Sequence, residues 1–381
     1  MRALLLALLL AFAGEAHAQT YPGTLLFEGA EFADFVCGAS PTDCLFAAYA
    51  GTSSAFRSEW SRGAFFINGQ HAGELQLPKP FAGQTTLWVH GWYCSLHIFV
   101  CPIDTVNPVV SFPRGYLFEL YNSQHNVAVQ VVGTGNAGQV AITGGNTSTT
   151  GGTWTTCPQW AFPLNSLQQI DFQFIYGAAG SAHFYVNGID VCDYTGDTST
   201  TDGATTITSA GFKSVNTDAG GGGVWSEVLI GTADTRTLRR SQVNIAGDGA
   251  TVQWSPAGAC ANIWNRAPSS PNPVDDSQFA NPIATPSINE CTIAPSVPTG
   301  DYAVVGLGLA ARARGATGGP AHLNWLNRIG VTDYTLTPQQ TPNPAGINSG
   351  NMLIQTTNPA TSAAWALSDF TSLQIGVQNE P

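Results

Sequence analysis

A short aromatic stretch at positions 88–93, with the sequence WVHGWY, contains the side chains best suited to bind a ligand. Alternate side chains of a strand point to opposite faces, so Trp88, His90 and Trp92 would share one face. If Val89 and Tyr93 are buried on the other face, the two indole rings form a platform that can stack sugar rings or anchor a protein partner. In the alternative, both tryptophans lie in the core and Tyr93 points outward, because large aromatic side chains are usually well buried.

A run of four aspartates is the second set of side chains that could do chemistry. Their carboxylates, with loop carbonyl groups, could supply some of the roughly six to eight hard oxygen ligands that calcium prefers. Their spacing is not that of the helical calcium-binding loop, so a polar, threonine-rich turn is the alternative. Calcium is the one candidate cofactor, with the candidate ligands Asp190, Asp193, Asp197 and Asp202.

Catalytic motifs are missing from the sequence. Retaining glycosidases place two carboxyl groups about 5 Å apart across the sugar bond, and the pattern Glu-x-Asp-x-x-Glu that would do so in a β-sandwich enzyme does not occur. The sequence also lacks Gly-x-Ser-x-Gly and His-Glu-x-x-His, which carry the nucleophile or the metal ligands of other hydrolases. We therefore expect no catalytic residue and a protein that is not an enzyme.

Eight cysteines follow the first 18 residues, an even number that is typical of disulfides formed in an oxidising compartment. Zinc would require thiolates two to four residues apart near histidines, and no such cluster occurs. Connectivity cannot be deduced from a sequence. Pairing by proximity predicts the disulfides Cys37–Cys44, Cys94–Cys101, Cys157–Cys192 and Cys260–Cys291.

Residues 1–18 have the features of a cleaved signal peptide, namely Arg2, an apolar run and Ala16-His17-Ala18 before the cleavage site. The apolar run is too short to span a membrane, and none like it follows, so we expect a secreted protein without a membrane span in its mature chain. Charged residues make up only 10 % of the chain, and its net charge is −12. Nucleic acid is excluded as a partner, because its binding requires clusters of lysine and arginine.

Strand-like segments separated by glycine, asparagine and proline turns run from residue 24 to residue 245. Alternation predicts that Ile170, Phe172, Phe174 and Tyr176 share one face of a strand. Asn187-Gly188 supplies the positive φ angles of a tight hairpin turn. A region dense in proline, asparagine and serine at 256–300 is predicted to be a loop, beyond which strand character resumes. The prediction is an all-β fold of two jelly-roll-like β-sandwich domains, residues 19–250 and a smaller one at 251–381.

Three phrases within this pattern resemble a known family: IDFQF at 170–174, HFYVNG at 183–188 and WSEVLI at 225–230. They are similar to strands of laminin-G or concanavalin A-like lectin/glucanase jelly rolls. Together with the NPAT phrase at 358–361 and LQIGV at 373–377, the order resembles two-domain β-sandwich proteins of tailed-phage virions and related surface structures. The resemblance implies a structural or adhesive role.

These observations lead to one expected function and two alternatives. We expect a non-catalytic, secreted structural or adhesive component of an extracellular or virion surface assembly, which associates with itself or with other assembly proteins. The first alternative is a monomeric carbohydrate-binding lectin that uses the face of Trp88, His90 and Trp92. The second is a divergent polysaccharide-degrading enzyme, which the missing carboxylate pattern disfavours.

Overall fold

The computed structural model describes residues 21–29, 81–96, 115–134, 138–145, 147–159, 168–214, 222–241, 243–255, 281–295, 302–309, 322–340 and 353–380, with short stretches between them. The predicted signal peptide lies outside the described residues, as do Cys44 and Cys101, so the predicted disulfides Cys37–Cys44 and Cys94–Cys101 are each described at one end only. In the described part of the chain, no helix is long and apolar enough to cross a membrane.

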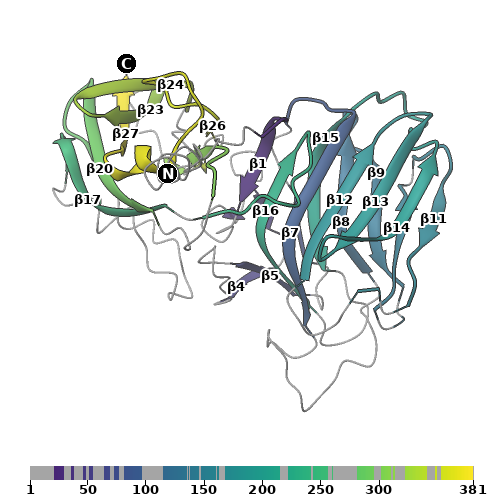
Figure 1. The fold of residues 1–381 in the computed structure, drawn as a ribbon. Helices are drawn as coiled ribbons and strands as arrows, with labels where there is room; N and C mark the ends of the chain where they lie inside the picture. Colours follow the sequence, from purple (N-terminus) through teal and green to yellow (C-terminus); the bar gives the residue numbers. More distant parts are fainter. Residues whose placement is uncertain are drawn as a thin grey trace, which may run out of the picture.

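Two eight-stranded sheets, here called sheet A and sheet B, form the first body, on the right of Figure 1. In sheet A the order is β14-β13-β12-β7-β16-β5-β4, and β1 also pairs with β16. Its strands are β1 (Leu25–Gly29), β4 (Gly51–Ser54), β5 (Ala64–Asn68), β7 (Thr86–Leu96), β12 (Gln168–Ile175), β13 (Gly180–Val186), β14 (Ile189–Gly196) and β16 (Gly222–Gly231). Every pairing within sheet A is antiparallel.

Sheet B has the order β11-β10-β9-β8-β15-β6-β3-β2. Its strands are β2 (Val36–Cys37), β3 (Phe46–Ala48), β6 (Gly73–Gln76), β8 (Gly115–Asn122), β9 (Val127–Gly133), β10 (Val140–Gly144), β11 (Gly152–Thr156) and β15 (Ile207–Ser214). Strands close in sequence are paired at one side of this sheet, whereas β15 pairs with β8 and β6 from far along the chain. The two sheets together make a β-sandwich, which confirms the predicted fold class.

Apolar side chains from both sheets fill the space between them. Ile170, Phe172, Phe174 and Tyr176 all lie in this core, as their alternation predicts. The rings of Phe172 and Phe118 meet edge to face across the sandwich, with their centroids 5.0 Å apart. Each fully buried phenylalanine contributes about 1.5–3 kcal/mol through the area it removes from water, so this row adds to the stability of the first body.

The predicted hairpin turn joins β13 to β14. Asn187 has a φ of 52° and Gly188 a φ of 79°, both in the left-handed region that such a turn requires. Between these strands, His183 lies opposite Asp193 and Tyr185 lies opposite Asp190. The turn therefore fixes which side chains meet on the outer face of sheet A.

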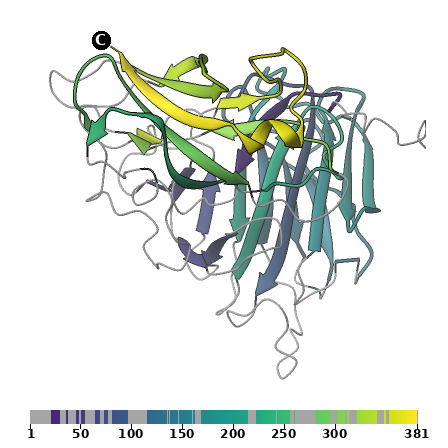
Figure 2. The ribbon, with the colours of Figure 1, turned by 60° about the vertical axis from the view of Figure 1, so that its left-hand side comes forward.

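A five-stranded antiparallel sheet, in the order β17-β20-β27-β23-β24, forms the second body, at the upper left of Figure 1 and above the first body in Figure 2. Its strands are β17 (Val243–Val252), β20 (Ser287–Pro295), β23 (His322–Ile329), β24 (Thr332–Gln340) and β27 (Gln374–Glu380). Three two-stranded pairs and a short 3-10 helix, η5 (Leu367–Thr371), accompany it, the pairs being β18 (Trp254–Ser255) with β19 (Asn281–Pro282), β21 (Leu307–Leu309) with β26 (Leu353–Gln355), and β22 (Arg312–Ala313) with β25 (Asn348–Ser349). This body has its own core, in which Trp325 and Trp365 are buried.

Strand pairing gives the second body two features that the sequence did not reveal. The expected boundary at residue 250 falls inside β17, which pairs with β20 of the five-stranded sheet. The prediction that 256–300 is a loop is wrong for Ser287–Pro295, which forms β20. Asn289 occupies a core position of this strand and is fully buried, so a polar residue interrupts the apolar alternation by which a strand is recognised.

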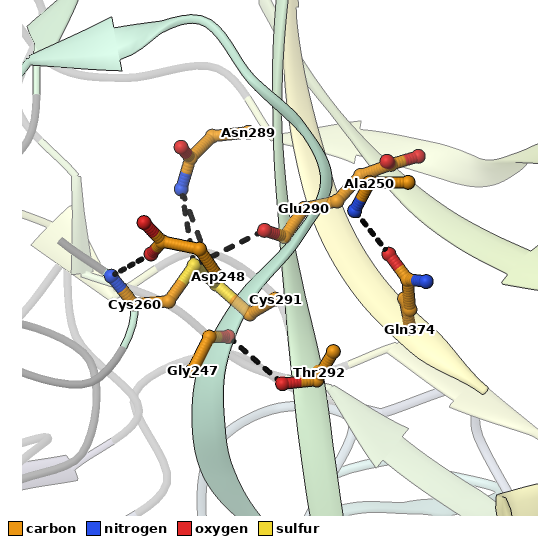
Figure 3. The surroundings of a disulfide bond; sticks show 9 residues. All are labelled: Gly247, Asp248, Ala250, Cys260, Asn289, Glu290, Cys291, Thr292 and Gln374. Atoms are coloured by element: carbon orange, nitrogen blue, oxygen red, sulfur yellow. Dashed lines mark hydrogen bonds between the residues drawn. A yellow bond between two sulfur atoms is a disulfide. The ribbon is translucent and has the colours of Figure 1, made fainter. Parts of the chain in front are cut away.

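Two of the predicted disulfides are present among the described residues, Cys157–Cys192 and Cys260–Cys291. Figure 3 shows the second, which ties the segment after β18 to β20. The Nδ2 atom of Asn289 lies 3.6 Å from Sγ of Cys260, and the backbone N–H of Cys260 donates to Oδ1 of Asp248 at 3.3 Å (Figure 3). Disulfides of this kind are typical of proteins that fold in an oxidising compartment.

Candidate functional site

Strand β7 places its two faces as the alternation predicts. Leu87, Val89 and Tyr93 lie in the core of the first body, where Tyr93 is only 2 % exposed. Trp88 and Trp92 therefore lie with His90 on the outer face of sheet A. The alternative in which Tyr93 points outward is wrong, because the ring of Tyr93 packs 4.8 Å from that of Trp225 inside the sandwich.

The neighbouring strands add polar and aromatic side chains to this outer face. Across the sheet, Tyr185 of β13 lies opposite Asp171 of β12, and Asp171 lies opposite His90. One step along, Gln169 lies opposite Trp92. We call this set the aromatic face, and its members are Trp88, His90, Trp92, Gln169, Asp171 and Tyr185.

A buried histidine–aspartate pair lies at the centre of the aromatic face. The Nδ1 atom of His90 is 2.7 Å from Oδ1 of Asp171, and neither side chain is exposed to solvent. The other oxygen of Asp171 accepts a hydrogen bond of 2.9 Å from Nε2 of Gln169. Both oxygens of the Asp171 carboxylate are thus engaged by protein donors, as the burial of a charge demands.

The segment 232–241, here called the strap, crosses the aromatic face on its way from β16 to β17. The guanidinium carbon of Arg236 lies 4.5 Å from the ring centroid of Tyr185 and 5.2 Å from that of Trp88. The guanidinium carbon of Arg239 lies 4.7 Å from the ring centroid of Trp92. These are cation–π distances, and they show that strap cations cover the tryptophan platform.

Hydrogen bonds also attach the strap to the sheet. Gln169 donates through Nε2 to the carbonyl oxygen of Arg236 at 2.8 Å and accepts from Nη2 of Arg239 at 3.3 Å. Within the strap, Thr235 is fully buried and Leu238 is 8 % exposed. The strap is therefore packed onto sheet A rather than held away from it.

Asp190 affects the pKa of Tyr185, and Asp234 holds the guanidinium group of Arg236. Burial raises the pKa of Tyr185, and nearby Asp190 raises it further, while Arg236 opposes both effects. Asp234 holds Arg236 in place through hydrogen bonds of 3.0 and 2.6 Å from its guanidinium group. The guanidinium group of Arg236 is thus oriented over the aromatic rings by a residue of the strap itself.

Several buried polar atoms at this face have no hydrogen-bond partner among the described residues. Buried polar groups are ordinarily paired, so each unpaired atom indicates an incomplete contact or a missing partner. Among them are Nε2 of His90, Nε1 of Trp92, Oγ1 of Thr235 and Nη1 of Arg239.

The four aspartates predicted as calcium ligands are not brought together. Within the described part of the chain, no group of three or more histidine, cysteine, aspartate or glutamate side chains could hold a metal ion. Asp190 is 3.2 Å from Nδ1 of His183, and Asp197 accepts from the backbone N–H of Ser199 at 2.9 Å. Asp193 is an exposed residue of β14.

Asp202 is engaged by protein donors rather than available to a cation. It accepts hydrogen bonds from Thr200 at 2.6 Å, from Asn126 at 2.7 Å and from Asn122 at 2.8 Å. Partial desolvation favours the protonated form, but these donors and the backbone N–H of Ala204 outweigh it and hold the pKa of Asp202 well below its ordinary value. These contacts match the alternative given above, in which Asp202 belongs to a polar, threonine-rich turn and not to a calcium site.

Sequence reasoning missed five residues of this region: Gln169, Asp171, Tyr185, Arg236 and Arg239. Two signals for them exist in the sequence. Asp171 is the one charged residue of β12 and shares its polar face with Gln169 and Gln173, and Arg236 and Arg239 are two of only 13 lysines and arginines in the chain. Neither signal predicts that the strap arginines contact the tryptophans, because those contacts join segments far apart in the chain.

No protein-family model matches this sequence, and none of the curated proteins matches it. Among solved structures, it is similar to a Bacillus subtilis protein of unknown function with a galectin-like fold, at 12 % identity and a TM-score of 0.36 over 57 % of this chain and 98 % of that one. It is also similar to an endo-beta-1,4-glucuronan lyase from the fungus Trichoderma reesei, at 9 % identity and a TM-score of 0.37 over 55 % and 96 %.

A third similar structure is domain 4 of an extracellular arabinanase from Geobacillus stearothermophilus in complex with arabinotriose, at 14 % identity and a TM-score of 0.36 over 55 % of this chain and 93 % of that one. Scores and identities this low carry no functional argument. The assignment of the fold rests on the sheet topology described above.

Proposed function

We propose that this chain is an exported, non-catalytic adhesive protein whose first β-sandwich binds carbohydrate through the aromatic face. The observation that carries the proposal is the arrangement of Trp88, Tyr185 and Trp92 on one outer sheet face with hydrogen-bonding groups between them. Aromatic rings stack on the apolar faces of sugar rings, and imidazole and amide groups pair with sugar hydroxyl groups. The two disulfides support export.

The proposal that the protein is not an enzyme is supported by the state of Asp171. Hydrolysis of a sugar bond requires one carboxyl group that delivers a proton and a second that acts as nucleophile or base. Asp171 is fully buried, and both of its oxygens are engaged by His90 and Gln169. That arrangement is typical of a carboxylate that orients a histidine and is not in contact with a substrate.

The experiment is a glycan array probed with the mature, oxidised protein, followed by the variants Trp88→Ala and Trp92→Ala. We expect binding to polysaccharide fragments that both variants lose. Because Trp88 is only 7 % exposed, Trp88→Ala should also lower the melting temperature, whereas Trp92 is half-buried, so Trp92→Ala should stay closer to the parent. Incubation with the bound polysaccharide should release no new chain ends. Binding that survives both substitutions would refute the aromatic face as the site, and cleavage of the polymer would refute the non-catalytic role.

A second candidate function is that of a structural component of a surface assembly, formed by association with other copies. Each body presents a large aliphatic side chain at a hairpin tip, Ile189 at 67 % exposure in the first and Val331 at 88 % in the second. Electron microscopy of the oxidised protein tests it, because filaments or rings support an assembly and dispersed particles count against one. Val331→Asp should disperse any assembly that uses the second tip.

A further inference from the structure

The strap brings to the aromatic face a kind of charge that the sheet itself lacks. None of the strands β7, β12, β13, β14 and β16 contains a lysine or an arginine. The face has instead the carboxylates of Asp171 and Asp190, and both act on the ring of Tyr185. The cations stacked on the tryptophans therefore come from Arg236 and Arg239 of the strap.

The contacts of the strap with the face are incomplete. The indole Nε1 of Trp92 and the Nη1 of Arg239 are both buried and without a partner among the described residues, although Arg239 lies over the Trp92 ring. On the same face, Nε2 of His90 is likewise buried and unpaired within the described part of the chain. Leaving a buried donor or acceptor unpaired opposes folding, whereas a ligand with hydroxyl groups can pair with the two atoms that belong to the sheet, Nε1 of Trp92 and Nε2 of His90.

We propose that the strap is a releasable latch that imitates a cationic ligand, and that the ligand which displaces it is a polysaccharide carrying protonated amino groups. This inference rests on the proposed function, because it assigns the sugar class to the same aromatic face. An ammonium group stacks on indole and phenol rings as a guanidinium group does. It would also be attracted by Asp171 and Asp190, whereas a uronic acid polymer would be repelled by them.

The contacts described between the strap and the aromatic face are hydrogen bonds and cation–π contacts, which a ligand can replace, and the start of the strap stays attached through hydrogen bonds between Ala233 and Tyr21. Arg236 is oriented by Asp234 within the strap, and that ion pair can remain intact when the strap leaves the sheet. The two hydrogen bonds of Gln169 to the strap can be replaced by sugar hydroxyl groups. Leu238 of the strap is 8 % exposed, and its apolar side chain would become more exposed on release.

The first experiment compares the parent protein with the double variant Arg236→Ala/Arg239→Ala and with the matched control Thr237→Ala, an exposed residue of the strap. Calorimetry with a glucosamine hexamer, whose amino groups are protonated, should show at least tenfold tighter binding to the double variant. Thr237→Ala should bind as the parent does. The fully N-acetylated hexamer and a galacturonate oligomer should bind the double variant more weakly than the glucosamine hexamer.

Equal or weaker binding of the glucosamine hexamer by the double variant would overturn the latch, and a preference for the acetylated hexamer would overturn the charge assignment. If the parent binds a neutral glycan through Trp88 and the double variant gains nothing, the proposed function stands and the latch alone fails. If neither protein binds any glycan on the array, the proposed function fails as well, and the latch with it.

A second measurement uses the unaltered protein and does not depend on the folding of a variant. Trypsin cleaves after arginine, and the strap offers Arg236, Arg239 and Arg240. We expect the glucosamine hexamer to accelerate cleavage of the strap severalfold, because displacement from the sheet exposes these bonds. Protection of the strap by the hexamer, or an unchanged rate of cleavage, would overturn the proposal.

Discussion

His90 and Asp171 form a fully buried pair on the outer face of sheet A, with Nδ1 and Oδ1 separated by 2.7 Å. Both oxygens of Asp171 are engaged, one by His90 and the other by Gln169, and Gln169 also donates to the strap. The face that the sequence suggested as an open platform is thus largely covered in this structure, with Trp92 half-buried. That difference is the basis of the latch.

The substitution Asp171→Ala should lower the free energy of unfolding by about 3–5 kcal/mol, because it leaves His90 buried without its partner. Urea denaturation followed by tryptophan fluorescence measures this change. The control Asp193→Ala removes an exposed carboxylate from the same sheet and should stay within about 0.5 kcal/mol of the parent. A change of similar size in both variants would mean that the buried pair has no special role.

Gly145→Ala should destabilise the first body by about 1–3 kcal/mol, because a Cβ atom at Gly145 would overlap the backbone carbonyl of Val127. Gly151→Ala in the same loop is the matched control. Its nearest neighbour would be the carbonyl oxygen of Ser148 at 3.9 Å, an ordinary contact. Thermal unfolding of the two variants should therefore separate them, and equal melting temperatures would contradict the close approach at Gly145.

Acid should weaken the first body through Asp202. Its pKa in the folded protein lies below the ordinary value of 3.8, so the carboxylate stabilises the fold above that pH and its contribution is lost as the pH falls further. Asp202→Asn removes this contribution. The stability difference between parent and variant should be larger at pH 6 than at pH 3, as measured by urea denaturation at both values, and a constant difference would refute the assignment.

Glu290 should show the opposite dependence in the second body. Burial raises its pKa above the ordinary value of 4.5, and neighbouring Asp333 raises it further, against the lowering effects of Thr251 and Arg328. The stability contributed by its protonated form is present below pH 4.5 and is lost as the pH rises through the raised pKa. The free energy of unfolding of Glu290→Gln, relative to that of the parent, should therefore be higher at pH 7 than at pH 4, as measured by urea denaturation. The reverse order would contradict the raised pKa.

Much of the first body could be predicted because its elements have simple local signals. Alternation placed Phe172 and Phe174 in the core, and the Asn187-Gly188 pair located the hairpin between β13 and β14. The second body was harder to read. Buried asparagines such as Asn289 and Asn327 interrupt the apolar alternation, so β20 was predicted as loop, and the second sheet begins earlier than expected, at β17.

The sequence by itself determined the all-β class and placed Trp88, His90 and Trp92 on one face, and spacing along the chain predicted two disulfides that the structure contains. These properties depend on strand periodicity and on spacing along the chain. Tertiary structure alone decided which face of β7 is the core, that the candidate calcium ligands stay apart, and that Arg236 and Arg239 cover the tryptophans. Those outcomes depend on contacts between segments distant in the chain, as between Asp202 and Asn122 or between Trp88 and Arg236, which no local pattern encodes.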